Sequence, residues 1–414
     1  MRSWSTICLT TIMMGWGWVG QQLQAQEPFQ ELLTSTERRV NQEHWHVTGK
    51  SVTPDCEHFW EITKETLHGG RQEGIEIIQV TAGGMHINLC PTRGMGILSV
   101  WTNDIQLRWD SPVQEIVHPQ FVNLESRGGL GWLWGFNEFM CRCGLESNGG
   151  PATDKFINNV GDEVEMELTL HGRIANIPAR EVEVIVDRQA PYTIHIRGHV
   201  DEKILFGPKL ELHTELVVIP GESRFRILDE IRNVGAQDQE FEILYHANYG
   251  APLLEKGAGI VVAAESVEPM NERAAAGLAD WATYGAPTTG FVEQVYLVTP
   301  KSDRDGRTTA VLHNAAADRA ASITWSVAEL PCLTVWKNTG AIADGYVTGI
   351  EPGTNFPNPR PVEREAGRVP VLAAGASHRM SLEFGIHVGH QSVNQAIQNV
   401  WNIGRVGEGR LPAP

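Results

Sequence analysis

The stretch Tyr192-Thr193-Ile194-His195-Ile196-Arg197-Gly198-His199-Val200 alternates apolar or small residues with polar ones. A period of two residues is that of a β-strand with one face buried and the other in contact with water. The same alternation runs through residues 163–171, 210–216 and 225–234, and a turn at Asn233-Val234-Gly235 ends the last of these segments. The pattern therefore predicts a series of antiparallel strands joined by short turns.

Further alternating or apolar stretches fill most of the remaining chain. Strands are predicted at residues 241–245, 290–298, 308–312, 321–327, 333–337 and 380–387. Helices are predicted only at residues 28–41 and 391–401. Short strands separated by polar turns are typical of an all-β protein, so we expect a large antiparallel β-sandwich with few short helices. No internal repeat or low-complexity linker divides the chain, and residues 26–414 are predicted to form a single domain.

Residues 1–25 have the pattern of a secretory signal peptide. Arg2 is the only charge before Glu27, an apolar run follows it, and Ala25 stands at the expected cleavage position. The apolar run is shorter than the ~20 residues that a transmembrane helix needs, which favours a cleaved signal over the alternative, an uncleaved membrane anchor. We therefore expect export to a periplasm or to the outside of the cell, and no stable membrane span in the mature form.

The net charge of −17 over 414 residues limits the partners of this chain. Nucleic acids and anionic membranes attract basic surfaces, so the acidic balance argues against both. No glycine-rich phosphate-binding motif stands between a predicted strand and a predicted helix, and no cofactor is expected.

The mature chain would hold five cysteines, an odd and small number for its length. Such a number does not build a disulfide scaffold, although one bridge is open in an oxidising compartment. Cys141 and Cys143 flank Arg142, but no second pair with zinc-like spacing follows, so small buried residues on one strand face are favoured over a metal site. The five cysteines are Cys56, Cys90, Cys141, Cys143 and Cys332.

Histidines and carboxylates share the polar faces of neighbouring predicted strands. His195 and His199 lie on one strand, and His213 lies between Glu211 and Glu215 on the next. One face of an antiparallel sheet can meet water, and a curved face of this kind makes a shallow trough that suits a sugar. A solvated outer face is the favoured interpretation for the three histidines. Because a spacing of i, i+2 on one strand does not define a metal site, none is predicted.

Three separate segments carry candidate catalytic side chains. Leu170-His171-Gly172-Arg173 ends an alternating strand, and Tyr245-His246-Ala247-Asn248-Tyr249-Gly250 lies where an apolar run breaks into a turn. Gly349-Ile350-Glu351-Pro352-Gly353-Thr354-Asn355-Phe356-Pro357-Asn358 places one carboxylate just before a sharp turn. A histidine exchanges protons near neutral pH, and a carboxylate can act as its partner. Together they provide the acid and the base needed to open and close a hemiacetal ring.

The order of these segments resembles that of the galactose mutarotase-like superfamily, whose fold is a β-sandwich. The closest resemblance is to an uncharacterised branch of aldose 1-epimerase-like proteins. Motifs of that branch are seen here as Pro91-Thr92-Arg93-Gly94-Met95, Cys143-Gly144-Leu145-Glu146-Ser147-Asn148-Gly149 and Leu170-His171-Gly172-Arg173-Ile174. The resemblance covers most of the mature chain, from about Gly83 to His387.

The resemblance implies a role for each candidate residue. His246 would be the general acid and Glu351 the general base of a sugar-anomer exchange that needs no cofactor. Other residues would bind the sugar, and four tryptophans could offer it an apolar face or belong to the core. The sugar-binding residues are Arg93, His171, Arg173 and Asn248, and the tryptophans are Trp132, Trp134, Trp281 and Trp336. Unlike the superfamily pattern, His246 is not followed by an aromatic pair, and the aspartate that holds substrate hydroxyls has no clear counterpart.

The sequence therefore predicts an exported carbohydrate-active enzyme that interconverts sugar anomers. Two alternatives stay open, because a fold does not fix a reaction. The first is a carbohydrate-binding protein without turnover, and the second is a sugar isomerase or lyase that uses the same cleft. We expect His171, His246, Glu351 and Arg93 to converge on one cleft, with the acid and the base on the two sides of a sugar ring.

Overall fold

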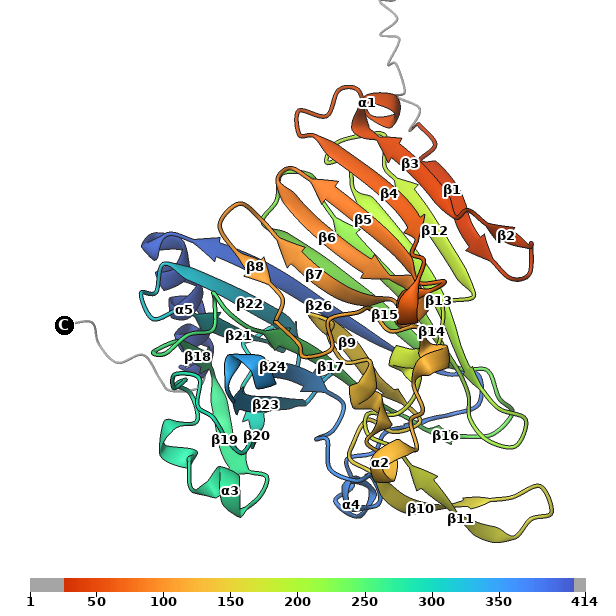
Figure 1. Cartoon of the computed structure of the whole chain (residues 1–414), viewed down its shortest axis with the longest axis vertical. Coiled ribbons are helices and arrows are strands. Elements are labelled where there is room, and N and C mark those ends of the chain that lie inside the picture. Colours follow the sequence, from red (N-terminus) through yellow and green to blue (C-terminus); the bar gives the residue numbers. More distant parts are fainter. Residues whose placement is uncertain (1–25, 406–414) are drawn as a thin grey trace, which may run out of the picture.

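The structure is a computed structural model, and it describes residues 26–405. Two large β-sheets are stacked on each other, with short helices around their margins (Figure 1). Neighbouring strands in both sheets run antiparallel, so the predicted antiparallel β-sandwich is confirmed. The predicted signal peptide, residues 1–25, lies outside the described residues. Both the signal peptide and the single domain over residues 26–414 stay predictions.

The first large sheet, called sheet A, has ten strands. These are β1 (Phe29–Ser35), β2 (Val40–Asn41), β12 (Glu181–Val186), β13 (Ile194–Lys203), β14 (Lys209–Val218), β15 (Arg224–Asn233), β18 (Gly259–Val262), β21 (Arg307–His313), β22 (Arg319–Ser326) and β26 (Ser377–Val388). Their order in the sheet is β18-β21-β22-β26-β15-β14-β13-β12-β1-β2.

The second large sheet, called sheet B, has twelve strands. These are β3 (His44–Thr48), β4 (Trp60–Thr66), β5 (Glu76–Ala82), β6 (Met85–Cys90), β7 (Gly96–Trp101), β8 (Gln106–Leu107), β9 (Met140–Leu145), β17 (Glu242–Tyr249), β19 (Ala264–Pro269), β20 (Gln294–Pro300), β23 (Cys332–Thr339) and β24 (Tyr346–Gly353). Their order is β19-β20-β23-β24-β17-β9-β7-β6-β5-β4-β3, and β8 pairs with β7.

The remaining elements are short, apart from one C-terminal helix. Two small sheets pair β10 (Ala152–Ile157) with β11 (Glu163–Leu168), and β16 (Gln239–Glu240) with β25 (Val371–Leu372). The α-helices are α1 (Gly49–Val52), α2 (Ser126–Gly129), α3 (Glu272–Ala275), α4 (Arg360–Glu365) and α5 (His390–Gly404). The 3₁₀ helices are η1 (Gly70–Gln72), η2 (Pro91–Arg93), η3 (Pro119–Phe121), η4 (Gly131–Trp134), η5 (Ile174–Asn176), η6 (Leu278–Asp280) and η7 (Ile342–Asp344).

The main hydrophobic core lies between the two sheets, where the alternation of the strands places it. On β13, Ile194, Ile196 and Val200 are fully buried, whereas His195, Arg197 and His199 face outward. On β17 of sheet B, Ile243 and Tyr245 belong to the same buried cluster. Each sheet therefore has an inner face in the core and an outer face on the other side of its strands.

The predicted helix at residues 391–401 is confirmed as α5. Its buried side chains recur every three or four residues, at Val393, Ile397 and Val400 among others, as on one face of an α-helix. They pack with Val311 and Ala320, so α5 covers the outer face of sheet A near β21 and β22.

The helix predicted at residues 28–41 is wrong. The segment forms β1 and β2, which pair with each other at one edge of sheet A while β1 also pairs with β12. The register shifts between Leu32 and Thr34, so an irregularity interrupts the two-residue alternation that marks a strand. Backbone pairing to an existing sheet decided the conformation here, against the local pattern.

The strand predicted at residues 163–171 is confirmed only in part. It ends at Leu168 and pairs only with β10, as a hairpin that projects from the body of the sandwich (Figure 1). Glu163, Glu165 and Glu167 are exposed there. They do not extend the polar outer face of β13 and β14, because β11 belongs to neither large sheet.

All five cysteines within the described residues are free thiols, and four of them are buried. Cys141 and Cys143 are completely buried on β9, which confirms their interpretation as small buried side chains. No helix within residues 26–405 combines the length and the apolar character that a membrane crossing requires.

A buried ion pair joins the two sheets. Arg142 on β9 donates from Nε and Nη2 to the carboxylate of Asp229 on β15, at 2.5 and 3.0 Å. The guanidinium also donates to Thr214 Oγ1 at 2.7 Å and to the carbonyl oxygen of Met95 at 2.9 Å. The hydroxyl of Tyr245 donates to Asp229 at 2.8 Å. A buried charge pair is tolerated only when its remaining hydrogen-bonding capacity is filled in this way, and the network fixes sheet B against sheet A.

We predict that Asp229→Asn lowers the free energy of unfolding by about 3–5 kcal/mol, because it leaves the Arg142 guanidinium buried without a counter-charge. Denaturant unfolding followed by circular dichroism measures the loss. The matched control is Arg232→Ala on the same strand, which breaks an exposed pair with Glu230 and should cost at most about 1 kcal/mol. Equal losses in the two variants would contradict the prediction.

Candidate functional site

His246 and Glu351 lie side by side on neighbouring strands of sheet B. The pairing of Ala247 with Ile350 sets the register of β17 against β24, and the antiparallel direction then brings His246 beside Glu351. His246 Nε2 and Glu351 Oε1 are 3.2 Å apart. Two segments that are distant in the sequence thus meet in one acid–imidazole contact.

The pair lies on the outer face of sheet B, away from sheet A. Tyr245, Ala247 and Ile350 belong to the main core, and strand alternation turns His246 and Glu351 the opposite way. Even so, the side chain of His246 is only 6% exposed and that of Glu351 only 2%. Other side chains therefore cover the pair on this outer face.

Three aromatic rings surround the imidazole of His246. The ring centroids of Phe136, Trp336 and Trp132 lie 5.1, 5.5 and 6.0 Å from it. Trp132 belongs to η4 and Phe136 follows that element, whereas Trp336 stands on β23. Flat apolar rings beside a polar pair suit a ligand with both C–H faces and hydroxyl groups.

Of the four candidate tryptophans, the structure places two at His246. Trp132 and Trp336 are among the rings just described. Trp134 is 49% exposed, and Trp281 packs near Tyr296 with ring centroids 6.4 Å apart.

Gly349 makes room for the carboxylate of Glu351. A Cβ atom at Gly349 would lie 2.1 Å from Glu351 Oε1, which is far inside van der Waals contact. Trp336 pairs with Gly349 on the adjacent strand. The side chain of Glu351 therefore folds back over Gly349, and any larger residue at that position would displace it.

Asn248 fixes the tautomer of His246. Its Nδ2 group donates to the carbonyl oxygens of Glu138 and His246 at 3.0 and 3.1 Å, so its Oδ1 atom must be the one that faces the ring. Oδ1 lies 2.7 Å from His246 Nδ1, and it can only accept. Nδ1 therefore carries a proton, and in the neutral ring the lone pair lies on Nε2, toward Glu351.

Burial sets the protonation of this pair. Burial, with a smaller contribution from the negative charge of Glu293, raises the pKa of Glu351 well above its usual value. Burial, with a contribution from His171, lowers the pKa of His246 well below its usual value. Both shifts disfavour charged forms, so a protonated carboxyl beside a neutral imidazole is favoured over an ion pair. The pair thus has one exchangeable proton, on the carboxyl of Glu351, and a free lone pair on His246 Nε2, which lies 3.2 Å from Oε1.

His171 lies beside this pair, with its ring centroid 5.3 Å from that of His246. The predicted bend of the chain is confirmed, because His171 and Gly172 have φ values of 59° and 66°. A Cβ atom at Gly172 would lie 2.2 Å from the carbonyl oxygen of Ser147, so this bend requires glycine. His171 Nδ1 donates to the carbonyl oxygen of Asn148 at 2.8 Å, and burial lowers the pKa of His171 to about 4.

Arg93 supports the site from behind. Its guanidinium is fully buried, with Nε 2.6 Å from Glu138 Oε1 and Nη1 donating to the carbonyl oxygen of Val117 at 3.0 Å. Nη1 also fills the space beside Gly135, because a Cβ atom added to this glycine would lie 2.5 Å from Nη1. These contacts brace the segment that carries Trp132 and Phe136. Sugar binding by Arg93 stays a prediction.

The predicted roles of Arg173 and Asn248 also stay predictions. Arg173 is exposed and its charge acts on Glu146 and Glu202. Within residues 26–405, no hydrogen bond or ion pair joins it to His246. Asn248 is completely buried, and its amide is already occupied by the three contacts that orient His246.

The expected convergence is therefore seen for three residues, His171, His246 and Glu351. The side chains of His246 and Glu351 lie 3.2 Å apart, and their expected placement on the two sides of a sugar ring stays a prediction. Direct contact still suits a hemiacetal, since its hydroxyl oxygen and its ring oxygen are bonded to the same carbon.

Sequence reasoning missed several residues of the site. Thr334 pairs with Glu351 across β23 and β24, and its buried Oγ1 has no hydrogen-bond partner within the described chain. Glu293 accepts from Trp336 Nε1 at 2.8 Å. Only Gly349 left a signal in the sequence, as a glycine two residues before the carboxylate. Thr334 lies on β23 and Glu293 just before β20, and the sequence does not reveal where these strands lie in sheet B.

The two-sheet sandwich has the fold of galactose mutarotase-like proteins. A protein from Clostridium acetobutylicum described as galactose mutarotase-like shares the fold, with a TM-score of 0.55 at 12% identity, over 84% of this chain and 100% of that one. The chain belongs to the family described as "domain of unknown function" (DUF4432), which matches residues 72–386.

A much more similar structure comes from Klebsiella pneumoniae subsp. pneumoniae. It is a candidate aldose 1-epimerase with 39% identity and a TM-score of 0.86, over 91% of this chain and 96% of that one. Among curated proteins, none matches this chain.

We predict that the two site histidines are neutral in solution while a surface histidine is charged. His171 should titrate near pH 4, because burial lowers its pKa, and His246 should also titrate below its ordinary range. His68 is the control, since its hydrogen bond with Glu73 raises its pKa. At pH 6, long-range ¹H–¹⁵N NMR spectra should show two Nδ1–H tautomers and one imidazolium. The prediction would be contradicted if the imidazoles of His171 and His246 titrated over the same pH range as His68.

Proposed function

We propose that the protein interconverts the anomers of an aldose, with His246 and Glu351 as the groups that move the protons. The observation that carries the proposal is the 3.2 Å approach of Nε2 to Oε1, which brings together two groups with oppositely shifted pKa values. Perturbed pairs of this kind are typical of acid–base sites. The similarity to a candidate aldose 1-epimerase supports the same reaction.

Ring opening follows from the resting protonation of the pair. Nε2 of His246 accepts the proton of the anomeric hydroxyl, and the carboxyl of Glu351 gives its proton to the ring oxygen. The bond between the anomeric carbon and the ring oxygen breaks while the anomeric C–O bond becomes a carbonyl. The products are an open-chain aldehyde, an imidazolium and a carboxylate, so protons and charge balance.

Ring closure reverses these transfers after rotation of the aldehyde. The ring hydroxyl attacks the other face of the carbonyl carbon, Glu351 regains its proton, and the imidazolium returns a proton to the new anomeric hydroxyl. Each group thus acts once as acid and once as base. In ring opening these roles are the reverse of those that the resemblance implies, because the opposite pKa shifts make Glu351 the proton donor and His246 the acceptor. Proton transfer by positioned groups typically contributes about 10²–10⁴-fold to a rate.

The surroundings of the pair support a neutral sugar as substrate. Trp132, Phe136 and Trp336 offer ring faces for the C–H groups of a sugar. Because the pair itself is almost fully covered, these side chains must move aside to admit a substrate. A carbohydrate-binding protein without turnover remains the second candidate, but such a protein has no use for a neutral acid–imidazole contact with a fixed tautomer.

Export completes the proposal. The signal-like segment before Ala25 favours action on free sugars in a periplasm or outside the cell. If so, N-terminal mass analysis of the mature protein should find Gln26 as the first residue. An intact Met1 in a membrane fraction would instead support the anchor.

We predict that Glu351→Gln abolishes anomer exchange and leaves sugar affinity within a few-fold of the wild type. Glutamine keeps the size and hydrogen bonding of the carboxyl but cannot transfer its proton, so the loss falls on kcat, by about 10²–10⁴-fold. Saturation-transfer NMR over a panel of aldoses measures exchange directly.

Glu222→Gln is the control, because Glu222 pairs with Arg224 on the surface and should leave exchange unchanged. Full exchange in Glu351→Gln would remove Glu351 from the reaction. A wild-type protein that binds sugars but exchanges none of them would favour the binding protein.

We predict that Gly349→Ala reduces exchange although Gly349 carries no reactive group. The added methyl group would occupy the position of Glu351 Oε1 and push the carboxyl away from His246. A 1 Å misplacement of this kind can cost about 10²-fold. The control is Gly340→Ala, where a Cβ atom would meet only ordinary contacts at 3.6 and 3.9 Å. Equal activity of the two variants would show that the carboxyl position is not critical.

A further inference from the structure

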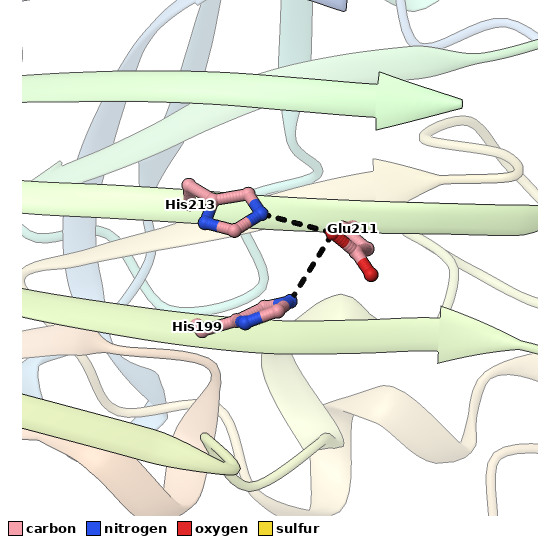
Figure 2. A group of neighbouring side chains, drawn as sticks. All are labelled: His199, Glu211 and His213. Atoms are coloured by element: carbon pink, nitrogen blue, oxygen red, sulfur yellow. Dashed lines mark hydrogen bonds and ion pairs between the residues drawn. The ribbon is translucent and has the colours of Figure 1, made fainter. Parts of the chain in front are cut away.

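A second cluster of histidines and carboxylates lies on the outer face of sheet A. His199 on β13 pairs directly with His213 on β14, and Asp201 pairs with Glu211 two residues further along. Val200 and Leu212 between them are completely buried in the core, so the four polar side chains share the outward face. Figure 2 shows Glu211 to one side of the two imidazole rings, joined to each by a dashed line.

The donor atoms of three of these residues converge. Glu211 Oε2 lies 3.0 Å from His213 Nε2 and 3.5 Å from His199 Nε2, and the ligand atoms all lie within 4.8 Å of one another. Two ligands of one tetrahedral zinc ion, each about 2.0–2.2 Å from the metal, lie about 3.3–3.5 Å from each other. The observed spacing therefore needs only small side-chain adjustments to hold a metal.

One donor atom of the cluster is left without a hydrogen bond. The buried Nε2 atom of His199 has no hydrogen-bond partner within the described chain, so one nitrogen is left to be satisfied.

We propose that His199, Glu211 and His213 bind a divalent transition-metal ion such as Zn²⁺, at a site separate from the proposed catalytic pair. Two imidazole nitrogens and one carboxylate oxygen are the ligands that zinc accepts, whereas calcium and magnesium prefer oxygen alone. Asp201 lies beside these ligands, with its Oδ1 2.9 Å from His199 Nε2.

Lys203 forms ion pairs with the carboxylates of the cluster. Its Nζ lies 2.5 Å from Glu211 Oε1 and 3.1 Å from Asp201 Oδ1, so an ammonium group balances part of the negative charge. It occupies the other oxygen of Glu211 and leaves Oε2 facing the histidines.

The position of the site sets its consequence. His199 and Glu211 lie on the outer face of sheet A, whereas His246 and Glu351 lie on the outer face of sheet B, with both sheets and the core between them. A metal bridging β13 and β14 would link two strands of sheet A and stabilise them. It takes no part in proton transfer, so this inference stands independently of anomer exchange.

The experiment is calorimetric titration of the purified full-length mature protein, first stripped with a chelator, with zinc chloride. The wild type should bind one Zn²⁺ per chain. His199→Ala, His213→Gln and Glu211→Gln should each weaken binding at least tenfold. The matched control is His195→Ala on the same strand, whose imidazole contacts Glu215 instead and should leave affinity unchanged.

Two further readouts make the result independent of folding defects. Without metal, thermal unfolding of each variant shows whether the sandwich is intact, and zinc should then raise the melting temperature of the wild type and of His195→Ala only. Cobalt bound to the wild type should show the visible absorption of a four-coordinate ion, which His213→Gln should lose. The proposal is overturned if the wild type binds no zinc, or if the three ligand variants bind zinc as tightly as His195→Ala.

Discussion

The buried pair of Arg142 and Asp229 is the constraint on which the rest of the structure depends. Arg142 belongs to β9 of sheet B, and Asp229 to β15 of sheet A, so their two hydrogen bonds lock the sheets at one register. Tyr245 on β17 adds its hydroxyl to the same carboxylate. Inside a dry core, a charge pair tolerates little displacement, because any movement would leave a charge unpaired. The inner faces of β9 and β17 are thereby held in place.

The candidate site is built on the reverse side of those same strands. Tyr245 precedes His246 on β17, and Arg142 lies between Cys141 and Cys143 on β9. Because successive side chains of a strand point to opposite faces, fixing the inner residue also fixes the outer one. The position of His246 beside Glu351 is thus supported from beneath by the network that joins the two sheets. A proton-transfer pair needs this rigidity, since small displacements weaken it strongly.

Burial gives the site its chemical character. Aromatic rings exclude water from His246 and Glu351, and in such surroundings both groups favour their neutral forms. Asn248 holds the imidazole in one tautomer through contacts with main-chain oxygens, and Gly349 leaves space for the carboxyl group. Arg93 braces the segment that carries two of the rings. Asn248, Gly349 and Arg93 have no reactive role, yet the geometry of the His246–Glu351 pair depends on each of them.

Much of the local structure could be predicted from the sequence, because strand alternation and helix periodicity are local. The strands around His195, His213 and Ile227 and the helix that contains Val393 were predicted for that reason. The edge hairpin at Leu33 was not, since pairing with β12 and an irregular register overrode the local pattern. His171, His246 and Glu351 were found through motif order. Thr334 and Glu293 were missed because neighbouring strands in sheet B come from distant parts of the chain.

The sequence by itself determined the fold class, the alternation of buried and exposed faces, and the three segments that carry His171, His246 and Glu351. These follow from side-chain chemistry and short-range spacing. The tertiary structure alone decided that His246 touches Glu351, that Asn248 orients the ring, and that His199 lies opposite His213. Each of these facts depends on strand order and register, which arise from hydrogen bonds between backbone segments distant in sequence, and no local pattern encodes them.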